Sequence, residues 1–168
     1  MNRRLLIIVL MACLLPLGMQ AQQGTFRFAQ LTDIHLTPNN PNPTEDLLRS
    51  VAQINATDSI DFVLVTGDLT EEGDRTTMEK VKSCLDLLKV PYHVVLGNHE
   101  TKWSDSGCTA FGEIFGGERF EFEHKGFLFL GFNSGPLMRM AYGHVVPQDI
   151  RWICLLYTSP SPRDRTRS

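Results

Sequence analysis

Three apolar runs in this chain end in the same way, and this repeated ending constrains the fold more than any other feature. The runs extend from Phe26 to Leu31, from Phe62 to Val65 and from Tyr92 to Leu96, and each is short and rich in strand-forming residues. They stop at "TDIH", "TGDLT" and "LGNHE". An ordinary strand end needs only a turn residue. Three polar endings therefore indicate that the strands bring side chains to a common place.

Two helix-like segments separate these runs. The first is expected from Thr44, as its capping residue, to about Ile54, and the second from about Arg75 to Leu88, because apolar residues recur there at helical spacing. Alternating strands and helices predict a parallel sheet with right-handed crossovers, covered on both faces. The fold class is therefore α/β.

The pattern changes after the third run. The segment "ERFEFEHKGFLFLGFNS" alternates phenylalanines on both sides of Lys125-Gly126, which predicts an antiparallel hairpin with its rings in the sheet core. We expect His93 to be packed or at the surface, and His124, beside the turn, to be solvated. Residues 148–153 are typical of the first turn of another helix, cut off after that turn.

The beginning of the chain is interpreted as a secretory signal peptide over residues 1–21, cleaved after Ala21. Two arginines precede an apolar stretch that ends at Leu17 and is too short to span a bilayer. A lipid-modified Cys13 is the less favoured alternative. We therefore expect a periplasmic or secreted protein with no transmembrane segment in the mature chain.

The composition changes abruptly at Cys154, where the chain continues as "CLLYTSPSPRDRTRS". A disordered tail is one explanation. The other is that codons for residues 154–164 can be written so that they resemble, in frame, the transposase adapter used in sequencing libraries. We interpret residues 154–168 as a non-native tail and expect the true chain to be interrupted near Ile153.

The segment between these ends, residues 22–153, is acidic. Without the five arginines and the single aspartate of the two ends, the 16 basic and 19 acidic residues become 11 and 18, a formal net charge of −7. A nucleic-acid-binding module would normally present a basic face, so this segment has no such signature. Cys84 and Cys108 could form one disulfide or remain two buried thiols, and their spacing matches no zinc module.

The polar strand endings form a candidate metal site. The carboxyl ends of parallel strands lie along one edge of a sheet, where ligands bind. Asp33 and His35 follow the first strand, Asp68 follows the second, and Asn98 and His99 follow the third. Capping and turn chemistry could explain the carboxylates and the amide, but it leaves two histidines at the same edge unexplained. We therefore favour a metal site.

The types of ligand indicate which ions the site would hold. Carboxylates, imidazoles and an amide carbonyl, without a thiolate, suit divalent Mn, Fe or Zn. Asp68 could bridge two ions through its two oxygens, and two such ions can share a hydroxide and clamp the attacked phosphorus centre. His99 would stand beside the second ion as a proton donor or as a cation for the leaving oxygen.

The same residues carry a family resemblance. "DIH" at Asp33, "GDLT" around Asp68 and "GNHE" around Asn98 resemble the first three signature blocks of the calcineurin-like metallophosphoesterases, in order and at suitable separations. The resemblance implies Asp33 and His35 on the first metal, Asp68 bridging, Asn98 on the second metal, and His99 as the catalytic histidine. It implies a layered fold of mixed β-sheets flanked by helices.

The resemblance covers about residues 26–153 and stops short of two later blocks, which in the family supply an isolated histidine and a Gly-His-x-His pair. His144 precedes that region, and Gln148 and Trp152 resemble the lead-in to the next helix, so we expect His144 not to be a ligand. Residues 22–153 are thus expected to be the N-terminal part of the catalytic domain, an incomplete domain.

We expect the complete protein to hydrolyse small phosphate esters with two divalent ions. Whether the substrate is a monoester, a diester or a phosphoanhydride is left open. The alternatives are a catalytically inactive truncated fragment and a metal-binding or scaffold module. Near the site, the acidic residues Glu71, Glu72 and Asp74 are expected to form a solvated loop. The alternative is that these residues form a rim that selects substrates. The loop 101–107 could contact substrate.

Overall fold

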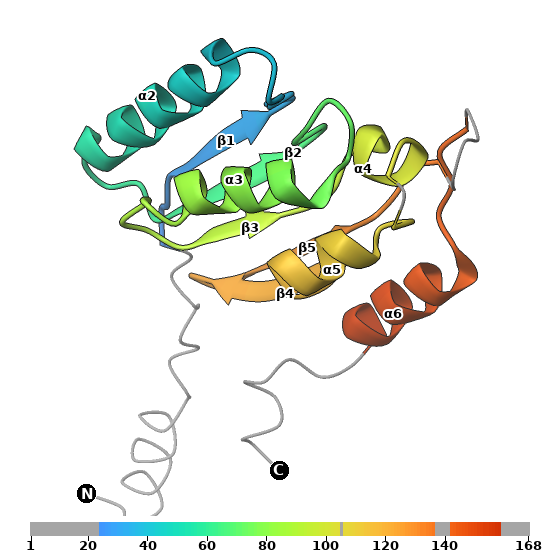
Figure 1. Ribbon diagram of the computed structural model, residues 1–168. Helices are drawn as coiled ribbons and strands as arrows, with labels where there is room; N and C mark the ends of the chain where they lie inside the picture. The colour runs from blue at the N-terminus through green and yellow to red at the C-terminus, as the bar shows by residue number, and fades with distance from the viewer. Residues whose placement is uncertain (1–23, 105, 137–141, 159–168) are drawn as a thin grey trace, which may run out of the picture.

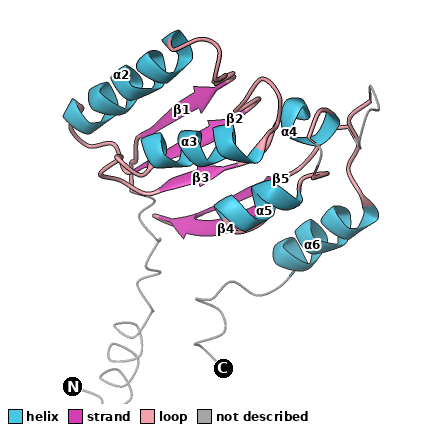
Figure 2. Ribbon diagram, in the orientation of Figure 1, coloured by secondary structure: helices cyan, strands magenta, loops and turns pink. Residues whose placement is uncertain are grey.

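The computed structural model describes residues 24–104, 106–136 and 142–158 (Figure 1). The predicted signal peptide, with Cys13, lies outside the described residues, as do residues 159–168 of the predicted tail. The described part contains parallel and antiparallel sheets flanked by helices, as Figure 2 shows. The prediction of a layered α/β fold is confirmed.

The parallel sheet consists of the three predicted strands. Strands β1 (Phe28–Thr32), β2 (Phe62–Thr66) and β3 (Tyr92–Val94) lie in the order β1-β2-β3, and both pairs are parallel. In the register, Phe28 pairs with Phe62 and Val63 with Tyr92. Because all three strands run in the same direction, the loops that follow them leave from one edge of the sheet.

Helices α2 (Asn42–Ala56) and α3 (Arg75–Leu85) pack on the same face of this sheet (Figure 1). The strand order explains this arrangement, since two right-handed crossovers made in one direction place both helices on one side. On the other face, rings of the hairpin pack against Phe62 of β2 and His93 of β3. The residues of β1 on that face, Phe28, Gln30 and Thr32, are exposed, so the expected cover on both faces is only partly present. The core between helices and sheet includes buried side chains of both layers: Leu47, Val51, Val63, Val65, Met78, Val81 and Leu85.

The helix boundaries differ slightly from the predicted ones. Helix α2 begins at Asn42, and Pro43 lies in its first turn, so Thr44 is inside the helix and does not cap it. Proline suits a first turn because its φ is already helical and no intrahelical partner is needed there. Helix α3 is capped by Asp74, whose side chain accepts a hydrogen bond from the backbone N–H of Thr77.

The predicted hairpin is present as β4 (Arg119–His124) and β5 (Phe127–Phe132). Its inward rings pack against the parallel sheet, and His93 stacks on Phe122 with ring centroids 3.7 Å apart. The expectation that His124 is solvated was wrong. Its ring lies 5.3 Å from that of Phe62, because it occupies the same face of β4 as Phe122, two residues earlier.

Three further helices complete the described chain: α4 (Asn98–Lys102), α5 (Thr109–Phe115) and α6 (Pro147–Thr158). The last of them continues well beyond the single turn that was expected, and Leu155 and Tyr157 at its end are exposed. Cys84 and Cys108 are both buried free thiols. Within the described ranges, no helix is both long enough and apolar enough to cross a membrane.

Candidate metal centre

Four of the five predicted site residues converge beyond the carboxyl ends of the strands. Asp33, His35 and Asp68 each offer a ligand atom within 4.8 Å of the others, and His35, Glu71 and His99 form a second group of the same kind. His35 belongs to both groups. The structure therefore brings the first two sequence blocks and the histidine of the third into one cluster.

Backbone pairing beyond β1 and β2 holds this cluster in place. The N–H of Asp33 donates to the carbonyl of Thr66 over 3.3 Å, and the N–H of His35 donates to that of Asp68 over 3.2 Å. Asp33 and His35 have φ values of 53° and 47°, in the left-handed region that L-residues rarely adopt. Strained residues of this kind gather at functional sites, where surrounding contacts hold them.

Asp68 lies at the centre of the cluster. It is only 7% exposed, and its Oδ1 accepts a hydrogen bond of 2.9 Å from the backbone N–H of His99. The Nε2 atoms of His35 and His99 are each 3.7 Å from Oδ2 of Asp68. One oxygen is thus fixed by the third block, and the other faces both imidazoles.

Two glycines make this close approach possible. A Cβ on Gly97 would lie 2.1 Å from Oδ1 of Asp68, and one on Gly67 would lie 2.7 Å from Oδ1 of Asp33. Gly67 also has a φ of +69°. The glycines of the second and third blocks are therefore required by space, and Gly67 is also required by its backbone conformation.

Glu71 orients both histidines, a role that sequence reasoning missed. Its Oε2 lies 3.0 Å from Nδ1 of His35, and its backbone carbonyl lies 2.6 Å from Nδ1 of His99. With an Nδ1 proton on each ring, the Nε2 atoms remain to face Asp68, which is how metal-binding histidines are usually held. Glu71 and Glu72 are exposed, as expected for a solvated loop, whereas Asp74 is half-buried and caps α3.

Local hydrogen bonds favour the charged form of Asp33. The hydroxyl of Thr32 donates to Oδ2 over 2.5 Å, and this bond is the main reason that the pKa of Asp33 lies below its ordinary value. Partial desolvation opposes the shift, whereas the backbone of Asp68 and the ring of His35 add to it. Asp33 is therefore an anion at neutral pH, as a metal ligand must be.

Glu100 connects the second and third blocks from inside the protein. Its side chain is fully buried, and its Oε1 accepts hydrogen bonds from the backbone N–H groups of Leu69 and Thr70 and from the Thr70 hydroxyl. Its Oε2 accepts one from the N–H of Gly97 over 3.0 Å. Burial raises the pKa of this carboxyl, and the four donors oppose that shift.

Asn98 and His144 each line a pocket. Asn98 is exposed at the start of α4 and lines a neighbouring pocket of about 570 Å³ together with Lys102. His144 lines a different pocket, of about 650 Å³, together with Arg119 and Asp149. Asn98 is thus beside the cluster, and His144 belongs to neither group of candidate ligands.

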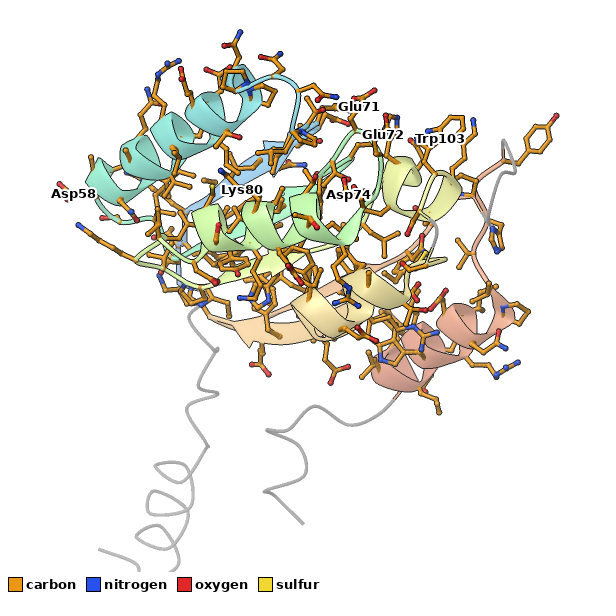
Figure 3. All side chains as sticks on the ribbon, viewed as in Figure 1. Asp58, Glu71, Glu72, Asp74, Lys80 and Trp103 are labelled. Atoms are coloured by element: carbon orange, nitrogen blue, oxygen red, sulfur yellow. The ribbon has the colours of Figure 1, made fainter. Side chains whose placement is uncertain are left out.

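The cluster fits a divalent metal ion by its donors. It offers carboxylate oxygens and imidazole nitrogens from separate loops, with no thiolate among the residues of the two groups. Such donors suit Mn, Fe or Zn. Figure 3 labels Glu71 and Glu72 in the segment between β2 and α3, and Trp103 at the end of α4.

A model of the calcineurin-like phosphoesterase family matches residues 26–158, and the chain belongs to this family. It is 33% identical over 97 residues to a probable cyclic nucleotide phosphodiesterase of Rhodopseudomonas palustris, over 54% of this chain and 33% of that protein.

Two further relatives show the same partial overlap. A 3',5'-cyclic-nucleotide phosphodiesterase of Nostoc is 24% identical over 74% of this chain and 48% of its own length. Human tartrate-resistant acid phosphatase type 5 is 29% identical over 64% of this chain and 37% of its own length. The chain thus spans between a third and a half of these relatives. Membership in the family implies divalent metal ions.

Proposed function

We propose that this chain forms part of a hydrolase of phosphate esters that works with a dinuclear metal centre. The observation that supports this most is the cluster at the carboxyl edge of the sheet, where Asp33, His35 and Asp68 offer ligand atoms within 4.8 Å of one another. Asp68 faces both imidazoles from between them. A carboxylate in that position suits a bridge between two ions.

Each residue of the cluster has a role in this proposal. Asp33 and His35 would hold the first ion, Asp68 both ions, and Asn98 the second. When bound, the ions supply positive charge at the phosphoryl oxygens and lower the pKa of water. A protonated His99 would keep its Nδ1 proton on the carbonyl of Glu71 and direct its Nε2 proton to the leaving oxygen.

The substrate is proposed to be a phosphate monoester or diester. The names of the two bacterial relatives, both cyclic nucleotide phosphodiesterases, favour a diester. The human relative is named as an acid phosphatase.

With residues 1–21 interpreted as a signal peptide, the proposed place of action is the periplasm or the extracellular space.

The test is hydrolysis of the chromogenic diester bis(4-nitrophenyl) phosphate with Mn, Fe or Zn supplied. Asp68→Asn and His99→Ala are expected to lower turnover by about 100-fold or more, because each removes a metal or proton contact. His144→Ala, which changes a histidine outside the cluster, should retain the wild-type rate. Wild-type turnover in His99→Ala would contradict the proposed mechanism.

The same assay separates this proposal from an inactive metal-binding piece. The exposed position of Asn98 is the observation that favours that alternative. Calorimetric titration would then show metal binding that depends on Asp68, without hydrolysis of the diester.

A further inference from the structure

Trp103 is a half-exposed tryptophan that lies next to His99. It directly follows α4, and its backbone N–H donates to the carbonyl of His99, four residues earlier, over 3.2 Å. The two rings are therefore neighbours, with centroids 6.4 Å apart and planes 79° apart. Yet 52% of Trp103 is exposed. A large apolar ring next to the proposed proton donor is left open to solvent.

The core does not account for this ring. The hydrophobic core of the described residues gathers around the sheet and helices α2, α3 and α5, and Trp103 is not among the side chains that pack against it. An indole usually contributes stability through the large area that it buries. Half-exposed and outside the core, this one contributes little in that way.

The ring of Trp103 and the ammonium of Lys102 form an aromatic and cationic wall beside His99. The ammonium of Lys102 lies 4.7 Å from the centroid of Trp103, and Lys102 also lines the pocket that contains Asn98. His99 also contacts the backbone carbonyl of Glu71, and the exposed carboxylates of Glu71 and Glu72 (Figure 3) make an acidic rim. The site thus has one aromatic and cationic wall and one acidic wall.

These walls would select between substituents on a bound phosphate ester. An additional anionic group, such as a second phosphate, would be repelled by the acidic rim. A flat uncharged ring could lie on the indole, since stacking on an aromatic side chain is favourable for any ring with a π-face. The aromatic wall reaches to His99, beside which the ester has to bind.

Resting on the proposed phosphate-ester hydrolysis, we propose that Trp103 is a specificity-determining residue that stacks on an uncharged aromatic substituent of the substrate. The substrate class is therefore aryl or nucleoside esters of a single phosphate, in preference to alkyl esters and phosphoanhydrides.

The first test compares two inhibitors of the metal-loaded protein, phenylphosphonate and ethylphosphonate, which share the charged head and differ in the ring. In the wild-type chain, phenylphosphonate should inhibit hydrolysis of bis(4-nitrophenyl) phosphate about tenfold more strongly. The preference should fall to about one in Trp103→Leu and largely persist in Trp103→Phe. Such a pattern would not follow from a purely structural role of Trp103.

A second test observes the ring directly. The chain has two tryptophans, so Trp152→Phe leaves Trp103 as the only indole. Trp152 belongs to α6, and the centroid of its ring lies 5.6 Å from the guanidinium carbon of Arg119 in β4. In this variant, loaded with zinc, phenylphosphonate should change the tryptophan emission at lower concentration than ethylphosphonate.

The outcomes distinguish the two proposals. If the diester is hydrolysed but the two phosphonates inhibit equally, or if their ratio is unchanged in Trp103→Leu, the role of Trp103 is refuted and the hydrolase proposal stands. If neither phosphonate binds and no ester is hydrolysed, both proposals are refuted.

Discussion

At the scale of single residues, Glu100 has the least usual environment in the described structure. It is a fully buried carboxylate, and among the described residues it has hydrogen-bond donors around it but no ion-pair partner. Its donors belong to the loops that carry Asp68 and His99. The carboxylate therefore holds the loop of Asp68 against the loop of His99.

Glu100→Gln is expected to weaken both the fold and the site. Glutamine keeps the shape but replaces one oxygen by an NH₂ group, which would face N–H donors and leave at least one of them unpaired. We expect the free energy of unfolding to fall by about 1–3 kcal/mol and metal affinity to fall with it. Chemical denaturation and calorimetric metal titration would measure the two effects.

The matched control for this change is Glu79→Gln, on the exposed side of α3. Exposed ion pairs contribute little, so this variant should behave as the wild type. Equal unfolding curves for both variants would show that the buried carboxylate does not fix the two loops.

Part of the role of Glu100 could be predicted from the sequence. A glutamate three residues after Gly97 has the spacing of a capping box, and its Oε2 does accept from the N–H of Gly97. The three bonds to Leu69 and Thr70 could not be predicted, because they join segments about thirty residues apart. The contacts of Glu71 with His35 and His99 could not be predicted either, because these residues are also far apart in the sequence.

At the scale of elements, the hairpin is attached to the parallel sheet by Asp61, the residue before β2. Asp61 accepts a hydrogen bond of 2.8 Å from Lys125 in the hairpin turn and one of 2.9 Å from the backbone N–H of Arg27. Chiefly because of Lys125, the pKa of Asp61 is lowered from 3.8 to about 2.

This shift predicts a pH dependence of stability. The folded state holds the proton of Asp61 less tightly than the unfolded chain, so its contribution is complete above pH 3.8 and is lost as the pH falls toward about 2. Asp61→Asn should therefore be less stable than the wild type at pH 6, and the gap should close by about pH 2. Chemical denaturation across this range measures the gap.

Glu121→Gln, on the exposed face of β4, serves as the control for Asp61. It should show no pH-dependent gap of this kind. A gap between Asp61→Asn and the wild type that stayed constant down to pH 2 would mean that the ionised carboxylate is not what attaches the hairpin.

The elements themselves were largely predictable, because apolar periodicity and strand-forming runs are local signals. Helices α2 and α3 and all five strands occur close to their expected positions. The face on which the helices lie could not be predicted, since it depends on strand order. The packing of His124 was missed for a similar reason, because the contact partners of the hairpin are distant in sequence.

At the scale of the whole molecule, the metal centre should couple to folding. The ligand groups meet only in the folded chain, so an ion that binds there stabilises the folded state by RT ln(1 + [L]/Kd), about 2.7 kcal/mol at a hundredfold excess over Kd. We expect the melting temperature to rise with added zinc or manganese and to fall with a chelator. Asp68→Asn should lose most of this shift.

Asp86→Asn is the control for that experiment, because Asp86 pairs with Lys82 on α3, outside the cluster. Its metal-induced shift should equal that of the wild type. An equal shift in Asp68→Asn would place the stabilising ion elsewhere on the molecule.

The left-handed backbone at Asp33 and His35 has a consequence for how this protein can change. Glycine would relieve strain at both positions, yet glycine cannot bind a metal. Selection for heat resistance alone would therefore favour substitutions that remove the candidate ligands, whereas selection for the proposed activity would keep the strained residues. At these two positions, evolution toward a more durable protein and evolution toward a better enzyme lead in opposite directions.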